Sequence, residues 1–107
     1  MTNTNAAVLK ISKSSSGSSL TMSLEGRLDT TTAPQLESEV KGGLEGVTEL
    51  AFDLSALEFV SSAGLRVFLL AQKAMKKQGI MTIRHPIPSV LKVFEVTGFS
   101  RILTIEK

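Results

Sequence analysis

The sequence predicts an α/β protein with a small mixed β-sheet, made of an N-terminal hairpin and parallel strands, packed with about three to four α-helices. Two apolar stretches joined by a serine-rich turn near the N-terminus indicate the hairpin. Downstream, helical and strand patterns alternate, and strands separated by whole helices are parallel because of crossover geometry. Since 107 residues with 42% apolar side chains suit one core, we expect residues 1–107 to form a single domain, with residues 1–7 as a flexible N-terminus.

The hairpin is predicted from Val8–Ile11 and Leu20–Leu24. In the second stretch, apolar and polar residues alternate, as in a strand with one buried face. Segment 13–19 contains five serines and one glycine, which is typical of a solvated turn.

The first helix is expected to begin near Thr32 and to run to about Lys41. Thr32 can cap the helix, and Gln35 can reach back as its capping-box partner. Pro34 suits the first turn, where its missing N–H would be unpaired in any case. The glycines at 42–43 are expected to end the helix.

The remaining elements follow in alternation. Val47–Leu54 has apolar residues at both parities, which predicts a central strand covered on both faces. The later elements are expected to be a helix over Gly64–Lys77, a strand over Ile80–Arg84, a helix capped by Ser89 and running through Val96, with Gly98 ending it, and a short strand or extended tail over Ile102–Ile105.

Composition narrows the function classes. Twelve basic and ten acidic residues leave a net charge of +2, and the chain has neither Trp nor Tyr, which speaks against nucleic acid as a partner. With no cysteine, a disulfide framework and a thiolate site are excluded. The first residues have no secretory pattern, and no apolar run reaches the roughly 20 residues of a membrane span. We expect a cytoplasmic protein that does not insert into a membrane.

Residues that could support catalysis are sparse. The one histidine, His85, precedes a proline, and no second His or Cys completes a metal set. A triad of Ser62, His85 and Asp53 can be drawn on paper, but no nucleophile-elbow sequence supports it. The glycines match neither phosphate-loop nor dinucleotide spacing. The sequence therefore predicts no enzyme, no cofactor and no metal.

The segment FVSSAGLRV places two serines where a buried strand meets an amphipathic helix. The simpler interpretation is that Ser62 or Ser61 is the N-cap, an interaction worth about 1 kcal/mol. A helical projection also places Leu65 and Leu69 in the polar arc, beside Ser62 and with Arg66 at the flank. These residues could form a small docking patch, although another segment, such as the loop around Leu28, could cover the two leucines instead.

A phosphate on Ser62 would add about −1.5 to −2 charges. At a helix N-terminus this charge is favourable by about 0.3–1 kcal/mol, so the fold would tolerate it. A partner packed over the patch would have to desolvate the phosphate, so binding would be lost.

Three stretches resemble the STAS domain of bacterial anti-sigma-factor antagonists: LAFDLSALEFVSSAGLRVFLLAQK, LEGRLDTTTAPQLE and VFEVTGFSRIL. The resemblance spans about Val8 to Ile105, and the strand followed by SSAGL is its most specific part. It implies a STAS fold and a partner-switching role. The unphosphorylated protein would bind an anti-sigma factor that is also a serine kinase and so free a sigma factor. Phosphorylation would end binding, and a dedicated phosphatase would restore it.

By position in the motif, Ser62 matches the phosphoacceptor of the family, with Ser61 as a competing acceptor. One well-known form of the motif has an acidic residue where Ser61 stands and a second serine where Ala63 stands. Asp29 and Thr30 match a loop near the acceptor that contributes to the partner surface. The expected partner-binding residues are Arg27, Asp29, Thr30, Ser61, Ser62, Leu65, Arg66 and Leu69.

Two other functions stay open from the sequence. The domain could be a permanent subunit of a transporter or lipid-trafficking complex, or it could bind nucleotides through free amides at the helix N-terminus. The protein is expected to be a monomer or a weak dimer.

Overall fold

The computed structural model describes residues 9–107, so the predicted flexible segment 1–7 and Val8 lie outside the described residues. The elements are β1 (Leu9–Ser16), β2 (Ser19–Leu28), α1 (Ala33–Gly43), β3 (Glu49–Val60), α2 (Ser62–Lys76), β4 (Ile80–Arg84), α3 (Pro88–Thr97), the 3₁₀ turn η1 (Phe99–Arg101) and β5 (Thr104–Glu106). The predicted order of a hairpin followed by alternating helices and strands is confirmed.

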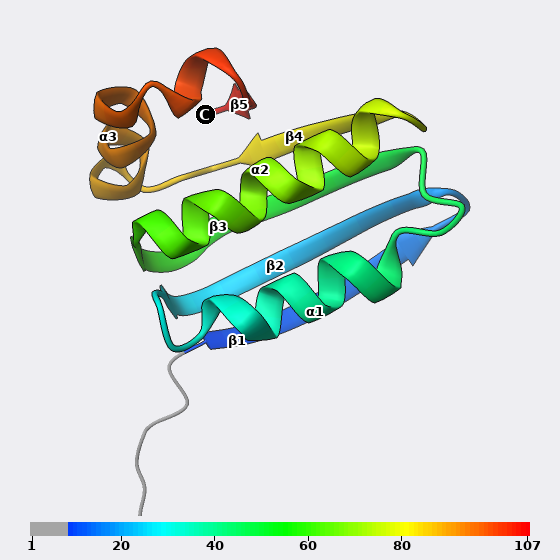
Figure 1. The fold of residues 1–107 in the computed structure, drawn as a ribbon, viewed down its shortest axis with the longest axis horizontal. Coiled ribbons are helices and arrows are strands. Elements are labelled where there is room, and N and C mark those ends of the chain that lie inside the picture. Colours follow the sequence, from blue (N-terminus) through cyan, green and yellow to red (C-terminus); the bar gives the residue numbers. More distant parts are fainter. Residues whose placement is uncertain (1–8) are drawn as a thin grey trace, which may run out of the picture.

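The five strands form one sheet in the order β1-β2-β3-β4-β5 (Figure 1). β1 and β2 are antiparallel, whereas β2, β3, β4 and β5 pair in parallel. Each parallel pair is joined through a helix, as a crossover requires. The expected mixed α/β sheet is therefore confirmed, with three α-helices and one short 3₁₀ turn among the described residues.

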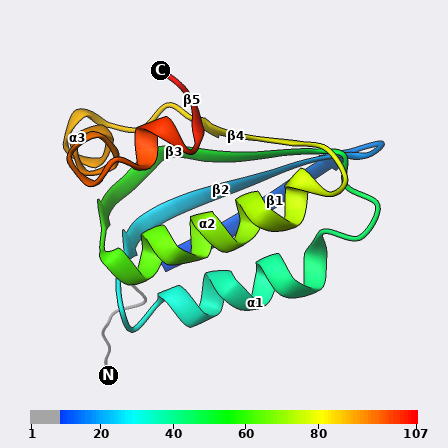
Figure 2. The ribbon, with the colours of Figure 1, turned by 45° about the horizontal axis from the view of Figure 1, so that its top comes forward.

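The helices α1 and α2 lie side by side on the same face of the sheet (Figure 2). The expectation that both faces of the central strand are covered is wrong. On β3, Leu50 and Phe52 are buried, whereas the alternate positions Glu49 and Asp53 are exposed and half-buried. Ala51, on that open face, is only 5% exposed. Its small side chain is flanked by the neighbouring strands, so its apolar character gives no sign of a second helical layer.

The buried apolar side chains form one cluster between the sheet and the helices. At its centre, the rings of Phe52 on β3 and Phe68 on α2 lie 5.1 Å apart in an edge-to-face arrangement. Phe94 on α3 lies 5.9 Å from Phe68. This row of rings connects the strand with two helices and fixes how α2 lies on the sheet.

The strand β3 extends to Val60, six residues beyond the predicted end. Its pairing with β2 has register shifts between Ser23 and Glu25 and between Gly26 and Arg27. Bulges of this kind interrupt the two-residue alternation of side chains, so Leu57 and Val60 are buried three residues apart. A reading based on strict alternation misses this part of the strand.

The predicted capping box of α1 is wrong. Thr32 makes no side-chain capping bond to the helix. Its hydroxyl instead donates to the Arg27 carbonyl at 2.9 Å and accepts from the Asp29 amide at 2.8 Å. Gln35 donates to the Leu9 carbonyl at 3.2 Å, so it ties α1 to β1. Each of the two side chains therefore bonds to a neighbouring segment and not to its expected partner in a capping box.

The ends of α3 and of the chain also differ from the prediction. α3 begins at Pro88 with Ile87 as N-cap and no side-chain cap, so Ser89 lies in the first turn and is not the cap. Gly98 ends the helix at φ 84°, as predicted. The turn η1 follows directly and shifts the last strand to Thr104–Glu106.

Candidate partner-binding site

The N-terminus of α2 is attached to the end of β2 by backbone and side-chain contacts. The Ser61 amide donates to the Leu28 carbonyl at 2.9 Å, and the Leu65 amide donates to the Ser61 carbonyl at 2.9 Å. Ser61 is extended, with φ −100° and ψ 176°, and its hydroxyl accepts from the Gly64 amide. Of the two serines proposed as N-cap, the structure therefore assigns the role to Ser61.

Ser62 is the first residue of α2 and is exposed. Its hydroxyl makes no hydrogen bond with any residue that the structure describes. Because Ser61 already provides the cap, the Ser62 hydroxyl is left at the surface, at the end of the helix where backbone amides point outward. The two serines thus have different surroundings, although they are adjacent in sequence.

Gly64 is packed directly against the end of β2. A Cβ added there would come 2.6 Å from Cγ and 2.8 Å from Cδ2 of Leu28, and 3.0 Å from Cγ2 of Val60. Only a residue without a side chain allows this approach. The contact brings the loop after β2 next to the first turn of α2.

That loop is organised around Asp29. Its Oδ1 accepts from the Thr31 hydroxyl at 2.8 Å, from the Thr31 amide at 3.0 Å and from the Thr32 amide at 3.2 Å. The hydrogen bond from the Thr31 hydroxyl is the main cause that lowers the pKa of Asp29 below its ordinary value of 3.8, against an opposing contribution from desolvation. Asp29 is therefore a structural anion of the loop.

Arg27 lies in β2, two residues before Asp29. Its guanidinium carbon is 4.3 Å from the centroid of the Phe59 ring, on the neighbouring strand. Its Nε is 3.8 Å from Oδ2 of Asp29. The predicted residues Arg27, Asp29 and Thr30 are thus brought beside the N-terminus of α2, and Thr30 is exposed.

The predicted patch of two exposed leucines is wrong. Leu65 is only 4% exposed and belongs to the core cluster, and Leu69 is half-buried. Leu65, Leu69 and Gln72 share one stripe of α2, and Gln72 donates to the Ile102 carbonyl at 3.4 Å. The segment after α3 therefore reaches this stripe of α2 at Gln72.

A groove between α1 and α2 opens beside Ser62. Its volume is about 300 Å³, and it is lined by Thr30, Ala33, Pro34, Glu37, Ala63, Arg66, Val67 and Leu70. Thr30 and Arg66 are among the residues predicted from the sequence, whereas the apolar lining is not. The signal that could have found it is the apolar spacing of residues 63, 67 and 70 on α2, although locating the groove also requires the packing of α1 beside α2.

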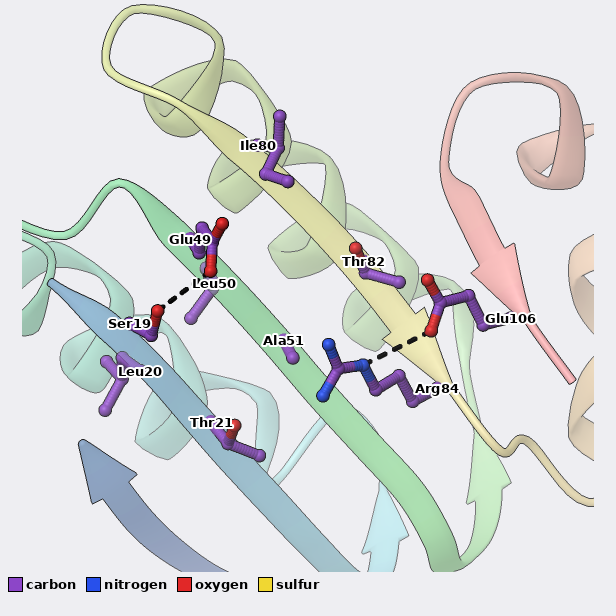
Figure 3. A pocket seen from close by; sticks show the side chains of 10 residues that line it. All are labelled: Ser19, Leu20, Thr21, Glu49, Leu50, Ala51, Ile80, Thr82, Arg84 and Glu106. Atoms are coloured by element: carbon purple, nitrogen blue, oxygen red, sulfur yellow. Dashed lines mark hydrogen bonds and ion pairs between the residues drawn. The ribbon is translucent and has the colours of Figure 1, made fainter. Parts of the chain in front are cut away.

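A second hollow lies on the open face of the sheet (Figure 3). Its charged groups are largely satisfied by one another: Ser19 donates to Glu49 at 2.8 Å, and Arg84 lies 3.3 Å from Glu106. No group of three or more potential metal ligands occurs among the described residues. The hollow therefore has no charge set directed toward a ligand.

Asp53 and His85, which were considered with Ser62 as a catalytic triad, make other local contacts. Oδ1 of Asp53 accepts from the Ser55 amide at 2.9 Å, and this bond is the main cause that lowers the pKa of Asp53. His85 follows β4 at φ 57°, and its ring lies 3.4 Å from the Lys107 carbonyl. None of the three makes a hydrogen bond to another within the described part of the chain.

No helix within residues 9–107 is long and apolar enough to cross a membrane.

The sheet with helices on one face, and α2 beginning directly after the central strand β3, define a STAS domain. A model of the family described as "Mlab, STAS domain" matches residues 11–104. BtrV of Bordetella bronchiseptica, which is proposed to be an anti-sigma factor antagonist, is 37% identical over 84 residues, covering 77% of this chain and 72% of BtrV. The chain therefore belongs to the STAS-domain family of anti-sigma factor antagonists.

Solved structures show the same fold. An anti-sigma factor antagonist from Mycobacterium paratuberculosis superposes with a TM-score of 0.84 at 22% identity, covering 92% of this chain and 85% of that one. The Bacillus protein SpoIIAA in its phosphorylated form superposes with a TM-score of 0.70 at 19% identity, covering 92% and 91%.

Proposed function

We propose that this protein binds, in its unmodified form, an anti-sigma factor that is also a serine kinase, and thereby releases a sigma factor for transcription. Phosphorylation of Ser62 by that kinase ends the binding, and a phosphoserine phosphatase restores it. The protein acts by binding in the cytoplasm and not by catalysis. Membership of the family supports the general role, and the surroundings of Ser62 support the switch.

The observation that carries the proposal is the difference between the surroundings of the two serine hydroxyls. Ser61 is engaged as N-cap, whereas the Ser62 hydroxyl is exposed and takes no part in the folded network of the described residues. A kinase can reach Ser62 without opening the fold. Ser62 is therefore our proposed acceptor, and Ser61 is not.

A phosphate at this position has opposite effects on the free protein and on a complex. Near the unpaired amides of a helix N-terminus, its negative charge is favourable by about 0.3–1 kcal/mol. In a complex, the same group must lose water, and each 1.4 kcal/mol of penalty weakens binding about tenfold. The fold is kept while the interface is lost.

The proposal is supported further by a relative of the same fold. SpoIIAA, whose similarity here concerns the fold, has been solved in an unphosphorylated and in a phosphorylated form. A chain of this fold can therefore carry the modification and remain folded.

The experiment is to incubate the protein with candidate anti-sigma kinases and ATP and to locate the phosphate by mass spectrometry. Ser62→Ala and Ser61→Ala are the matched variants. We expect Ser61→Ala to be phosphorylated and Ser62→Ala not to be. Phosphate found only outside Ser62, or undiminished phosphorylation of Ser62→Ala, would exclude the proposed switch.

A further inference from the structure

The charged side chains of α2 are all basic. Residues 62–76 include Arg66, Lys73 and Lys76 and no acidic residue, and Lys77 follows. None of these four cations has an ion-pair partner among the described residues. On α1, in contrast, Glu37 pairs with Lys41 at 2.9 Å and Glu39 pairs with Lys13 of β1 at 2.6 Å. Among the charged residues of the two helices, the unpaired ones are therefore the cations of α2.

An apolar stripe accompanies these cations. Ala63, Val67, Leu70 and Ala74 follow one another at spacings of four, three and four residues, so they share one face of α2. The first three line the groove of about 300 Å³ between α1 and α2. Leu70 and Ala74 also line a separate hollow near the C-terminal end of α2, and its other lining residues are Lys73, Lys76 and Lys77. The surface is apolar along its centre and basic along its α2 edge, whereas the α1 edge carries Glu37, which is paired with Lys41.

We infer that this surface, the α1–α2 groove with the cations of α2, binds an acidic segment of the anti-sigma factor, which inserts an apolar side chain into the groove and places carboxylates against Arg66 and Lys73. The inference rests on the proposed function and adds the chemistry of the partner to it. Charge complementarity selects this occupant, because a basic segment would face four like charges. Buried apolar anchors framed by charges are typical of the residues that dominate binding energy.

Arg66 also connects this surface with the switch. It follows Ser62 by four residues, so the two side chains are neighbours on adjacent turns of the helix. A phosphate on Ser62 would lie within reach of the Arg66 guanidinium, and arginine binds phosphate strongly in a bidentate geometry. Arg66 would then pair with the phosphate instead of with the partner, and the new negative charge would repel the acidic segment. Phosphorylation thus makes Arg66 unavailable to the acidic segment of the partner.

The contact between Arg66 and the phosphate can be measured without the partner. Three proteins that carry phosphoserine at position 62 are titrated with acid and followed by ³¹P NMR: the wild type, Arg66→Gln and Lys73→Gln. The second phosphate ionisation lies at about pH 6 in the absence of specific contacts. We expect the midpoint of this ionisation to be higher in Arg66→Gln than in the wild type by about 0.5 pH units or more. In Lys73→Gln it should be unchanged. Equal midpoints in the wild type and in Arg66→Gln would overturn the capture of Arg66.

The acidic character of the partner is measured with the anti-sigma kinase that phosphorylates Ser62. We expect Arg66→Glu to weaken binding of the unmodified protein at least tenfold, and Lys10→Glu, on the open face of the sheet, to leave binding unchanged. Binding of Arg66→Glu as tight as that of the wild type would overturn the assignment of this surface. If phosphorylation of Ser62 still abolished binding in that case, the proposed function would stand and only the inference would fail.

Discussion

The Oγ of Ser61 lies 3.4 Å from the amide nitrogen of Gly64 and accepts its hydrogen bond. This bond closes the first turn of α2 with a residue that is not the proposed phosphoacceptor. The capping role and the proposed regulatory role therefore fall to adjacent serines, so each can be changed separately.

Substitution of the two serines should give different effects on stability. Ser61→Ala removes the cap and is expected to lower the free energy of unfolding by about 0.5–1 kcal/mol, in the lower part of the range for caps because the bond is long. Ser62→Ala is expected to change it by less than about 0.5 kcal/mol, as for a surface residue without partners. Urea unfolding of both variants checks this. A larger loss in Ser62→Ala than in Ser61→Ala would contradict the assignment of the cap.

Gly64 should not tolerate a methyl group. Gly64→Ala forces its Cβ against Leu28, which is fully buried, and overpacking of this kind costs about 1–3 kcal/mol. Gly42→Ala is the matched control, because a Cβ at this helical position meets nothing within 4 Å. The control should keep or raise stability, by up to about 1 kcal/mol. Thermal unfolding that ranks Gly64→Ala as the more stable variant would exclude the close contact.

The two leucines of α2 should separate into a core residue and a half-buried one. Leu65→Ala is expected to cost about 2–5 kcal/mol, as is usual for a buried leucine. Leu69→Ala is expected to cost about 1 kcal/mol or less, since it removes less area from the interior. Denaturant unfolding measures both. Similar small losses would mean that Leu65 is exposed after all.

Stability should depend on the ionisation of Asp29 at acidic pH. Because hydrogen bonds, above all from the Thr31 hydroxyl, lower the pKa of Asp29 in the folded state, its contribution is fully present above about pH 5 and is lost as the pH falls through the folded pKa. Asp29→Asn should therefore be less stable than the wild type at pH 7, and the difference should shrink toward pH 2.

The test of this dependence is urea unfolding of both proteins at several pH values. Thr31→Val, which lacks the main donor, serves as a comparison and should lose less stability on acidification than the wild type. A gap between Asp29→Asn and the wild type that widens as the pH falls would have the wrong sign for a lowered pKa.

Most of the fold could be predicted because local patterns and topology agree. The boundaries of β4, Ile80–Arg84, match the prediction, since this strand is short and regular. The missed parts depend on contacts between distant segments. The bulges against β2 hide the second half of β3, and Ala51 is buried by neighbouring strands instead of by a helix. Thr32 donates to the Arg27 carbonyl at the end of β2 instead of capping α1.

The candidate site was predicted in part for the same reasons. The motif located Ser62 and the loop around Asp29, because both depend on short sequence stretches. A helical projection could not show that Gln72 of α2 reaches the Ile102 carbonyl, since this contact joins residues 30 positions apart. Nor could it show the groove to which α1 contributes Ala33 and Pro34.

The central claim is that a phosphate on Ser62 prevents partner binding without unfolding the protein. The most direct measurement is calorimetric titration of the anti-sigma kinase with unmodified and Ser62-phosphorylated protein, after thermal unfolding has shown that both are folded. The account predicts tight binding of the unmodified form and an affinity at least a hundredfold weaker for the phosphorylated form, which corresponds to about 2.8 kcal/mol. Equal affinities of two equally folded forms would contradict it.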